Sequence, residues 1–573
     1  MQSAGQFEGA YDPGVPRHLE YPAIPLHGLL EATARESPDL VATIFGGAVA
    51  GRCVDAKLTY RDLDRLADRF AAGLQRLGIS KGDRVALVLP NCPQFVYCFF
   101  GALKAGAVVV PTNPLYTVRE LHAQLADSGA RAVVVLSRLY PQVAEAARGT
   151  SVERIVVTNI KEHFAAPLRA LFSVARERKE GHRVDISADG RALWLRELIA
   201  HDGVPARVAV AATDLAVLQY TGGTTGIAKG AMLSHRALVA NAYQCRAWHT
   251  TMRQGDRMLA VMPFFHVYGL TVVMNLAVLG RMTMVLIPRP DLKHMFLAIE
   301  KHRPRFFPGA PRIYILLNES RELARHDLTS IESFLSGSAP LPIEVMRRFE
   351  QLTGNGKVME GYGLTEAAPV THSNPREGQR KPGSVGIPMP DVECKIVDIE
   401  TGTREVPPGE PGELCLRGPN LMDGYWQRPD ETALALRDGW LYTGDIVRMD
   451  TDGYFFVVDR KKEMIIVSGF KVYPREVDEI LYKHPAVLEA AAVGVPHPSK
   501  GEVVKAFVVL RPGATATAQE IVDHCRANLA PFKVPVEVVF RESLPKTLIG
   551  KVLRRVLVDE SPDISVTPLP RAG

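Results

Sequence analysis

The most informative stretch of this chain is YTGGTTGIAKG at residues 220–230. Its glycines allow backbone turns that residues with a Cβ resist, and its threonines and Lys229 add hydroxyls and one positive charge. A strand-like run precedes it at 214–220, a shorter one follows at 231–233, and Ser234 is suited to cap a helix. We therefore predict a glycine-rich hairpin tip that binds a polyphosphate.

This stretch departs from the Walker phosphate loop, which needs glycine directly before the lysine and a hydroxyl residue directly after it. Here Ala228 precedes Lys229, and Gly230 follows it. The donors must then come from the backbone and hydroxyls of a hairpin rather than from a helix N-terminus. A mobile Gly/Thr linker stays open as an alternative, whereas the missing Walker and kinase motifs disfavour a kinase-type ATPase.

Composition limits the class of protein. A chain of 573 residues is too long for one core, so we expect two or more domains. The net charge of +5 is small for this length and gives no argument for a nucleic-acid partner. Seven cysteines without a C-x-x-C pair predict a reducing compartment and neither a disulfide framework nor a thiolate metal site. With no secretory signal in the sequence, we expect a cytoplasmic protein.

The order of patterns predicts the architecture. Strand-like runs stand at 84–90, 107–111 and 132–136, with a helical pattern at 118–125. Such alternation implies parallel sheets covered by helices. Beyond a hairpin at 450–453 and a charged break at 459–463 lies a smaller α+β unit. We predict an α/β fold: a large N-terminal domain with two helix-covered sheets and a β-rich subdomain, then a small mobile α+β C-terminal domain.

The predicted boundaries follow from these breaks. They are a flexible arm at 1–22, an N-terminal domain at 23–459, a C-terminal lid domain at 460–560 and a disordered tail at 561–573. Residues 259–279 hold no Asp, Glu, Lys or Arg and are long enough to cross a bilayer. Pro263, Gly269 and Asn275 interrupt them, so we predict a buried core segment instead.

Five further motifs carry groups suited to nucleotide chemistry. They are EGYGLTE at 360–366, YTGD at 442–445, DRKK at 459–462, SGFKVYP at 468–474 and PKTLIGK at 545–551. Each alone has an ordinary reading as a surface acid, a turn or a solvated lysine cluster. Together, in this order, they resemble the adenylate-forming superfamily of acyl-CoA synthetases, firefly-type luciferases and peptide-synthetase adenylation domains. The resemblance spans about residues 25 to 560 and is closest to bacterial long-chain fatty acid–CoA ligases, whose fatty-acyl signature is similar to residues 438–474.

The resemblance implies a reaction in two halves. A carboxylate attacks the α-phosphorus of ATP to give acyl-AMP and pyrophosphate, and the CoA thiol then attacks the acyl carbon and expels AMP. Three alternatives stay open: an acyl-AMP ligase that serves a carrier protein, a CoA ligase for medium-chain or aryl acids, and a membrane-surface acyl-binding protein without catalysis. The presence of Glu366, Asp445 and Lys551 disfavours the last.

The resemblance also implies residue roles. The residues it assigns to catalysis are Lys551, Glu366, His266 and Thr221. Lys551 would bridge the carboxylate and the α-phosphate as a point charge, while Thr221 and Glu366 would hold Mg²⁺. The residues assigned to ATP or AMP are Thr221, Gly222, Gly223, Thr224, Thr225, Gly226, Lys229, Gly337, Ser338, Gly361, Tyr362, Gly363, Thr365, Asp445, Arg460 and Lys551. Lys462 would be the hinge, and Ser468, Gly469, Phe470 and Lys471 would face CoA.

Two roles have ordinary alternatives. His266 would lie nearest the acyl carboxylate, although a satisfied core histidine is the alternative. A helix from Pro167 would place Phe164, Leu168, Leu171, Phe172 and Ala175 on one face. That helix is either an ordinary core-facing helix or a contact with a membrane surface.

We expect fatty acid, ATP and CoA as substrates with Mg²⁺ as cofactor, and leave peripheral membrane contact and the choice of monomer or homodimer open.

Overall fold

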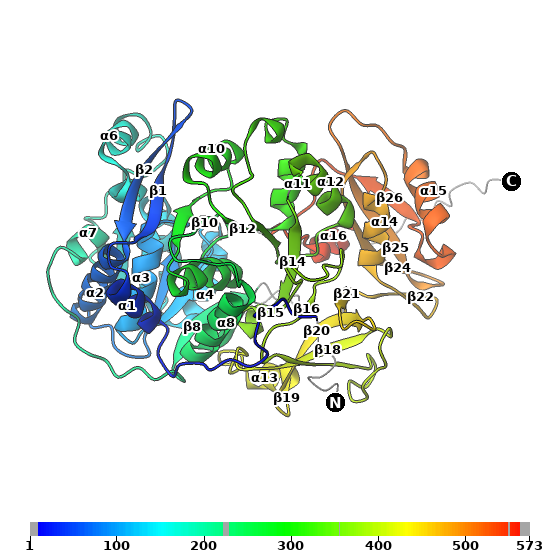
Figure 1. Ribbon diagram of the computed structural model, residues 1–573, viewed down its shortest axis with the longest axis horizontal. Helices are drawn as coiled ribbons and strands as arrows, with labels where there is room; N and C mark the ends of the chain where they lie inside the picture. The colour runs from blue at the N-terminus through cyan, green and yellow to red at the C-terminus, as the bar shows by residue number, and fades with distance from the viewer. Residues whose placement is uncertain (1–9, 222–227, 355, 548–549, 562–573) are drawn as a thin grey trace.

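The computed structural model describes residues 10–221, 228–354, 356–547 and 550–561. Figure 1 shows four sheets, two in the body of the N-terminal part, one in a β-rich subdomain and one at the C-terminal end. The predicted α/β architecture is therefore confirmed. The hinge and the mobility of the C-terminal part stay predictions.

The first sheet has seven strands in the order β7-β6-β5-β3-β4-β8-β9. The bounds are β3 Arg84–Val88, β4 Val108–Pro111, β5 Ala130–Leu136, β6 Arg154–Thr158, β7 Ala192–Trp194, β8 Leu215–Thr221 and β9 Lys229–Ser234. All neighbours are parallel except β8 and β9, which form the predicted antiparallel hairpin. Ser234 caps the next helix by accepting a hydrogen bond from the Ala237 N–H group, as the sequence predicts.

The second sheet has nine strands in the order β16-β15-β14-β13-β12-β10-β11-β1-β2. The bounds are β1 Val41–Val49, β2 Arg52–Thr59, β10 Arg257–Ala260, β11 Thr283–Leu286, β12 Phe306–Gly309, β13 Ser333–Ser336, β14 Val358–Gly363, β15 Val370–Ser373 and β16 Ile387–Pro388. Its centre is parallel, and both edges are antiparallel. An antiparallel edge lets consecutive strands pair through short turns, while the parallel centre needs helical crossovers.

Helices cover these two sheets. The bounds are α1 His27–Glu36, α2 Tyr60–Arg76, α3 Pro93–Lys104, α4 Val118–Ser128, α5 Tyr140–Ala146, α6 Ala166–Ala175, α7 Leu195–Leu198, α8 His235–Trp248, α9 Leu276–Leu279, α10 Leu292–His302, α11 Pro311–Glu319 and α12 Ile343–Thr353. Every residue of α3 is buried, as expected for a helix that is apolar on all sides. The helical pattern predicted at 118–125 is confirmed by α4.

The long apolar segment is part of the core. After β10 the chain forms a wide helical turn at Gly269–Asn275 that continues into α9, and nearly all of its side chains are buried. A Cβ on Gly269 would lie 2.1 Å from the carbonyl oxygen of Pro263, so the turn requires glycine. No helix in the described ranges combines the length and apolarity that crossing a bilayer demands.

The remaining elements form the β-rich subdomain and the C-terminal part. The subdomain has β17 Glu393–Val397, β18 Gly412–Arg417, α13 Pro429–Ala435, β19 Leu436–Arg437, β20 Trp440–Met449 and β21 Phe455–Arg460, with the predicted hairpin between the last two. The C-terminal part has β22 Ile465–Val467, β23 Phe470–Val472, α14 Pro474–Tyr482, β24 Val487–His497, β25 Gly501–Leu510, α15 Ala518–Asn528, β26 Glu537–Phe540 and α16 Arg554–Asp559. It has separate apolar clusters of its own.

The arm predicted at 1–22 is held to the body over its described residues. Asp12 accepts hydrogen bonds from the N–H groups of Arg376 and Gly378 at 2.6 Å. Asp391 accepts a hydrogen bond from the Tyr21 hydroxyl at 2.6 Å and another from the Leu19 N–H group at 2.9 Å. Side-chain carboxylates thus replace the secondary structure that this segment lacks.

Gly386 joins the nine-stranded sheet to the subdomain and generates the first prediction. Its φ is +87°, and a Cβ there would lie 2.0 Å from the Ser373 carbonyl carbon. Its carbonyl oxygen accepts a hydrogen bond from the Phe455 N–H group at 2.9 Å. We expect Gly386→Ala to lower the free energy of unfolding by about 3 kcal/mol or more, because the added Cβ brings both left-handed backbone strain and a clash with the Ser373 backbone.

The matched control is Gly439→Ala, where φ is +76° but no heavy atom lies within 4 Å of the added Cβ. This change should cost only about 1 to 2 kcal/mol. The midpoints of thermal unfolding of the two variants measure the difference. Equal shifts would show that the contact at Gly386 adds nothing to the strain.

Candidate active site

The centre of the site is a buried carboxylate, Asp445, on β20. It lies opposite Arg460 on β21, whose Nε is 3.1 Å from Asp445 Oδ1. The Tyr362 hydroxyl, from the end of β14, donates a hydrogen bond to Asp445 Oδ2 at 2.6 Å. Burial, followed by the Asp445 charge, holds the pKa of Tyr362 well above its usual range, so the phenol stays a donor. The structure thus brings together residues from three of the predicted motifs.

A second carboxylate, Glu366, follows on the turn after β14. A Cβ on Gly363 would lie 2.1 Å from the Pro369 carbonyl oxygen, so glycine is needed for the chain to reverse there. Glu366 Oε1 accepts a hydrogen bond from the Tyr425 hydroxyl at 2.8 Å. Among the described residues, Oε2 has no hydrogen-bond donor. This oxygen can therefore meet a metal ion or a ligand.

The predicted phosphate hairpin approaches the same carboxylate. Thr221 and Lys229 face each other across β8 and β9. Lys229 forms an ion pair with Glu431, and its Nζ lies 5.3 Å from the centre of the Tyr425 ring. Burial, and then the charge of Lys462, lowers the pKa of Lys229. The predicted ligands Gly222, Gly223, Thr224, Thr225 and Gly226 lie outside the described residues.

A group of buried polar atoms without partners lies near Tyr362, where Ser336 pairs with Glu360 in the sheet. The hydroxyls of Ser336 and Ser338 and Oε2 of Glu360 are buried without a hydrogen-bond partner. Burial raises the pKa of Glu360 to about 7. Gly337 between the serines packs on the Tyr268 ring, which would be 3.4 Å from a Cβ. Buried polar atoms without partners are rare, so this group indicates a ligand that supplies them.

The C-terminal part contributes one lysine to this cluster. Lys551 follows a turn in which its N–H group donates to the Thr547 hydroxyl at 3.1 Å. Burial lowers the pKa of Lys551, and Arg460 lowers it further, while Asp445 partly offsets both.

Burial, with a smaller contribution from the Lys551 charge, lowers the pKa of His266 to about 4. His266 is therefore neutral at pH 7, and its Nδ1 accepts a hydrogen bond from the Tyr268 N–H group.

The predicted hinge residue lies in a short exposed turn. Lys462 separates two neighbours that are bound to different parts of the molecule. Lys461 Nζ is 2.9 Å from Glu413 of β18, and Glu463 accepts a 3.0 Å hydrogen bond from Arg554 of α16. A rotation between these two anchors would leave both ion pairs intact.

The four residues predicted to face CoA are not at this cluster. Ser468 and Gly469, with φ of +50° and +86°, form the turn between β22 and β23. The ring of Phe470 is exposed and stacks on Phe532 at 4.7 Å. The Nζ atom of Lys471 lies 3.5 Å from Oε1 of Glu400. Their contacts are therefore with the surface of the C-terminal part and with the subdomain.

Sequence reasoning missed three residues that hold the site. Tyr425 orients Glu366, Glu431 neutralises Lys229, and Arg511 of the C-terminal part pairs with Glu319 of α11. The partners in these pairs are between 59 and 202 residues apart. These three residues lie outside the sequence motifs quoted above. A single aromatic or charged residue in a sequence gives no signal by itself, because it is compatible with many surfaces.

Comparison with known proteins gives the family. Residues 30–426 match the family model of the AMP-binding enzyme, and residues 476–551 match that of the AMP-binding enzyme C-terminal domain. The chain belongs to the AMP-binding enzyme family. The predicted resemblance to adenylate-forming enzymes is thereby confirmed.

Relatives of this AMP-binding enzyme are similar over nearly the whole chain. It is 44% identical to the long-chain-fatty-acid–CoA ligase of Bacillus subtilis, over 98% of this chain and 99% of that one. The ligase of the same name from Salmonella typhimurium is 41% identical, over 88% and 90%. ATP-bound MatB from Rhodopseudomonas palustris has a TM-score of 0.82 at 30% identity, over 94% and 100%.

Proposed function

We propose that this enzyme joins a long-chain fatty acid to CoA through an acyl-adenylate, with release of AMP and pyrophosphate. The observation that carries the proposal is the meeting of Lys551 with the Asp445–Arg460–Tyr362 cluster, in a chain similar to ligases of that activity. An adenylation site requires a cation beside the bound nucleotide, because the fatty carboxylate and the α-phosphate of ATP, both anions, must approach each other. Lys551 would be that cation.

In the first half-reaction, cations surround the reacting phosphate. Lys551 would bridge the fatty carboxylate and the α-phosphate, and Lys229 would bind the pyrophosphate side. Asp445 would accept hydrogen bonds from the ribose hydroxyls, with Arg460 and Tyr362 fixing its position. Neutral His266 would lie beside the carboxylate without adding charge.

The adenine would lie beside Tyr362 and accept hydrogen bonds from the unpaired hydroxyls of Ser336 and Ser338. Ser338 has a buried hydroxyl with no partner, and its φ of +73° shapes the turn that carries it. Gly337, Gly361 and Gly363 would let the backbone approach the base closely. Thr365 would support the turn that leads to Glu366.

The donors present fit a magnesium ion. Mg²⁺ is commonly held by one or two carboxylates together with substrate phosphates and water, and Glu366 Oε2 is available for such a bond. The Thr221 hydroxyl would complete the protein's share. When bound, the ion would neutralise charge on the phosphates of ATP.

In the second half-reaction the C-terminal domain would rotate about Lys462. This motion would withdraw Lys551 and bring the turn at Ser468 and Gly469, with Phe470 and Lys471, toward the acyl-AMP. The exposed turn at 461–463 between two anchored neighbours supports a hinge there. The ion pair of Arg511 with Glu319 would have to break.

An acid-panel assay tests the proposed function. Pyrophosphate release is measured with palmitate, octanoate and benzoate, with and without CoA and with EDTA. We expect kcat/KM for palmitate to exceed that for octanoate by about tenfold or more, because each buried methylene adds binding energy. AMP turnover should need CoA, and EDTA should stop both steps. Preference for benzoate, or turnover independent of CoA, would contradict the proposal.

The two lysines should separate the two half-reactions. Lys551→Ala should reduce acyl-AMP formation about a hundredfold or more, yet largely spare thioester formation from supplied acyl-AMP. Lys462→Pro fixes φ at the pivot and should do the opposite. Each variant is the other's control in single-turnover assays of both steps. Equal loss in both steps would reject the assigned role of the lysine concerned.

We also propose that the enzyme contacts the cytoplasmic face of a membrane through α6. The seven cysteines are all free, which fits a reducing compartment. The sequence predicts that Leu171 and Ala175 share the face of Phe164, Leu168 and Phe172, and this prediction is wrong for Leu171 and Ala175, which are both exposed. Leu168 and Phe172 are buried, whereas Leu171 is 50% and Val174 91% exposed.

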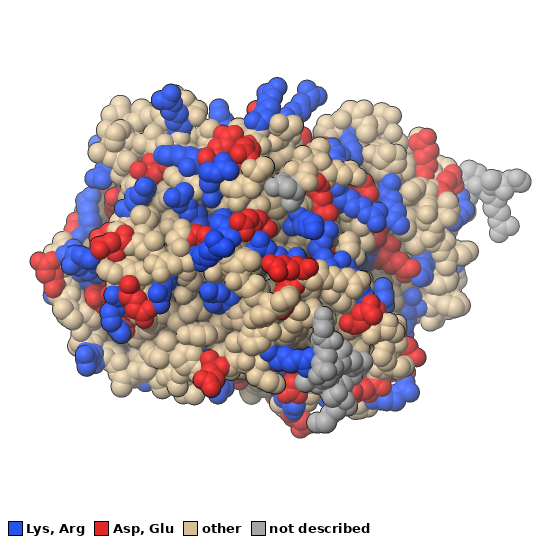
Figure 2. Space-filling model, viewed as in Figure 1, with Lys and Arg blue, Asp and Glu red and all other residues tan. Residues whose placement is uncertain are grey.

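The exposed side of α6 is a second apolar face. Pro167, Ala170, Leu171 and Val174 recur at the spacing of one helical face, and all are exposed. The exposed basic residues that follow are Arg176, Arg178 and Lys179. An apolar stripe beside cations is the pattern of a helix that lies in an anionic lipid surface. Figure 2 shows acidic and basic side chains interspersed on the face in view, and the net charge is only +5, so long-range attraction by the whole protein is weak.

Leu171→Asp tests this contact against a matched control. Leu352 of α12 is 48% exposed and far along the chain, so Leu352→Asp makes the same change elsewhere. Partition onto phosphatidylglycerol vesicles is measured by flotation. We expect Leu171→Asp to weaken it about tenfold or more, since burying a leucine is worth roughly 1.5–3 kcal/mol, and salt to weaken it further. Equal effects of the two variants would exclude α6 as the contact.

A further inference from the structure

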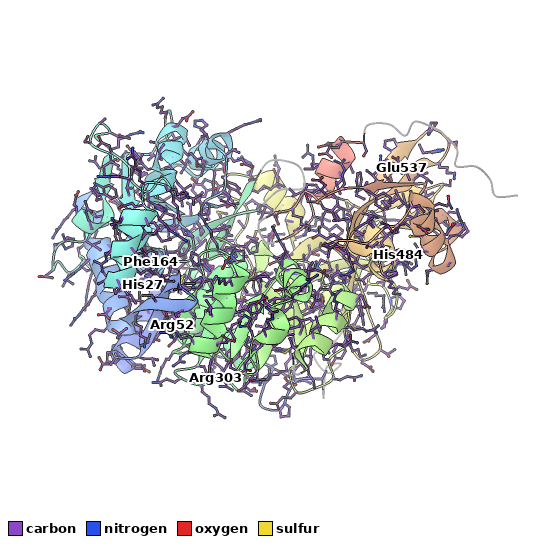
Figure 3. The ribbon with its side chains drawn as sticks, turned by 90° about the horizontal axis from the view of Figure 1, so that it is seen from above. His27, Arg52, Phe164, Arg303, His484 and Glu537 are labelled. Carbon is purple, nitrogen blue, oxygen red and sulfur yellow. The ribbon has the colours of Figure 1, made fainter. Side chains whose placement is uncertain are left out.

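An open pocket lies at the edge of the nine-stranded sheet, beside α6. Its volume is about 180 Å³, smaller than a pocket that encloses a drug-sized ligand, so only part of a longer molecule fits inside it. The residues that matter in its lining are Thr43, Phe45, Ala56, Leu58, Phe164 and Arg169. Figure 1 shows α6 beside the outer ends of β1 and β2, and Figure 3 labels Phe164 in this region.

The floor of the pocket follows from strand register. Thr43 of β1 pairs with Leu58 of β2, and Phe45 pairs with Ala56. Alternate residues share one face of a strand, so these four side chains line the same surface. The next position on that face, Gly47, lies under Leu168 of α6, 3.7 Å from its ideal Cβ. Helix α6 therefore covers one end of the face and leaves the other end open.

One wall of the pocket is aromatic. The Phe164 ring stacks on Phe45 with 5.4 Å between centroids, and Phe172 packs edge-on against Phe164. Ala56 and Leu58 are only partly buried because β2 is an edge strand. The pocket thus has an apolar floor that opens toward solvent.

Two donors in the lining lack an acceptor. Thr43 is fully buried, and its hydroxyl has no hydrogen-bond partner. Arg169 donates one hydrogen bond, from Nη2 to the Phe164 carbonyl oxygen at 3.2 Å. Within the described part of the chain, no carboxylate forms an ion pair with Arg169. The buried hydroxyl calls for an acceptor, and the exposed Arg169 guanidinium has N–H groups that an anionic acceptor can reach.

The acid that also lines the pocket does not fill that role. Glu162 accepts hydrogen bonds from the Thr158 hydroxyl at 2.7 Å and from the Asn159 N–H group at 3.1 Å. Its two oxygens are therefore occupied within its own turn. His163 is neutral, because burial lowers its pKa to about 4. The described lining therefore carries one cation, Arg169, and one carboxylate, Glu162, whose hydrogen-bond donors are both neutral.

This pocket is separate from the nucleotide cluster. Tyr362 lies on β14, and four strands of the sheet stand between β14 and β1. At about 4.8 Å per strand, the two are roughly 24 Å apart. A molecule bound here is not the one that reacts beside Lys551.

We propose that the pocket binds a second fatty carboxylate. The carboxylate oxygens accept hydrogen bonds from Arg169 and Thr43, and the hydrocarbon chain lies over Phe45, Ala56 and Leu58. The choice of a fatty acid rests on the proposed function, whereas the anionic head and apolar tail follow from the lining. The site holds substrate beside the exposed face of α6.

Equilibrium dialysis with radiolabelled laurate tests the proposal on the full-length enzyme without ATP. We expect two laurate molecules per chain. Arg169→Gln should weaken one site about tenfold or more and leave the other unchanged, because it removes a charge-assisted bond. Ala56→Trp should fill the pocket and reduce the stoichiometry to one, with acyl-CoA formation at saturating substrate unchanged.

Arg178→Gln is the matched control, since Arg178 is exposed nearby but does not line the pocket. A stoichiometry of one in the unaltered enzyme would overturn the proposal. So would equal weakening by Arg169→Gln and Arg178→Gln, which would indicate non-specific attraction. If the enzyme made no acyl-CoA from long-chain acids but still bound two laurates, the proposed function would fail and the pocket would stand.

Discussion

The pairing of the buried Asp445 carboxylate is the interaction on which the site depends. A buried charge without partners is costly, so Arg460 and the Tyr362 hydroxyl must stay in place beside it. Tyr362 belongs to the nine-stranded sheet, and Asp445 belongs to the subdomain. The same pairing that satisfies the charge therefore fixes these two parts relative to each other. It also forms the surface beside which Lys551 lies.

Charged residues on either side of Lys462 bind different parts of the molecule. Lys461 is bound to the subdomain and Glu463 to the C-terminal part, with the exposed Lys462 between them. Ion pairs that are partly exposed contribute little stability each, so a contact such as Arg511 with Glu319 can break at small cost. The anchoring of Lys461 and Glu463 to different parts of the molecule is the physical basis for the proposed domain rotation.

A different task is proposed for the far edge of the same sheet. Helix α6 is apolar on two faces, one packed on β1 and one exposed beside basic residues. A water-exposed apolar face is unfavourable by itself, so it indicates a partner that covers it. The pocket next to this face combines apolar walls with the Arg169 guanidinium and the Glu162 carboxylate. Lipid contact and fatty-acid binding are thus proposed for one region, far from the phosphate chemistry.

Sequence alone determined the local features and the family. The hairpin of β8 and β9, the Ser234 cap, the turn at 450–453 and the buried character of 259–279 follow from turn residues and short-range periodicity. Tertiary structure alone decided that Tyr425 orients Glu366, that Glu431 neutralises Lys229 and which face of α6 is buried. These depend on contacts between distant segments, and a helix as apolar as α6, with Arg169 and Ser173 as its only polar residues, does not show from its pattern which apolar face is buried.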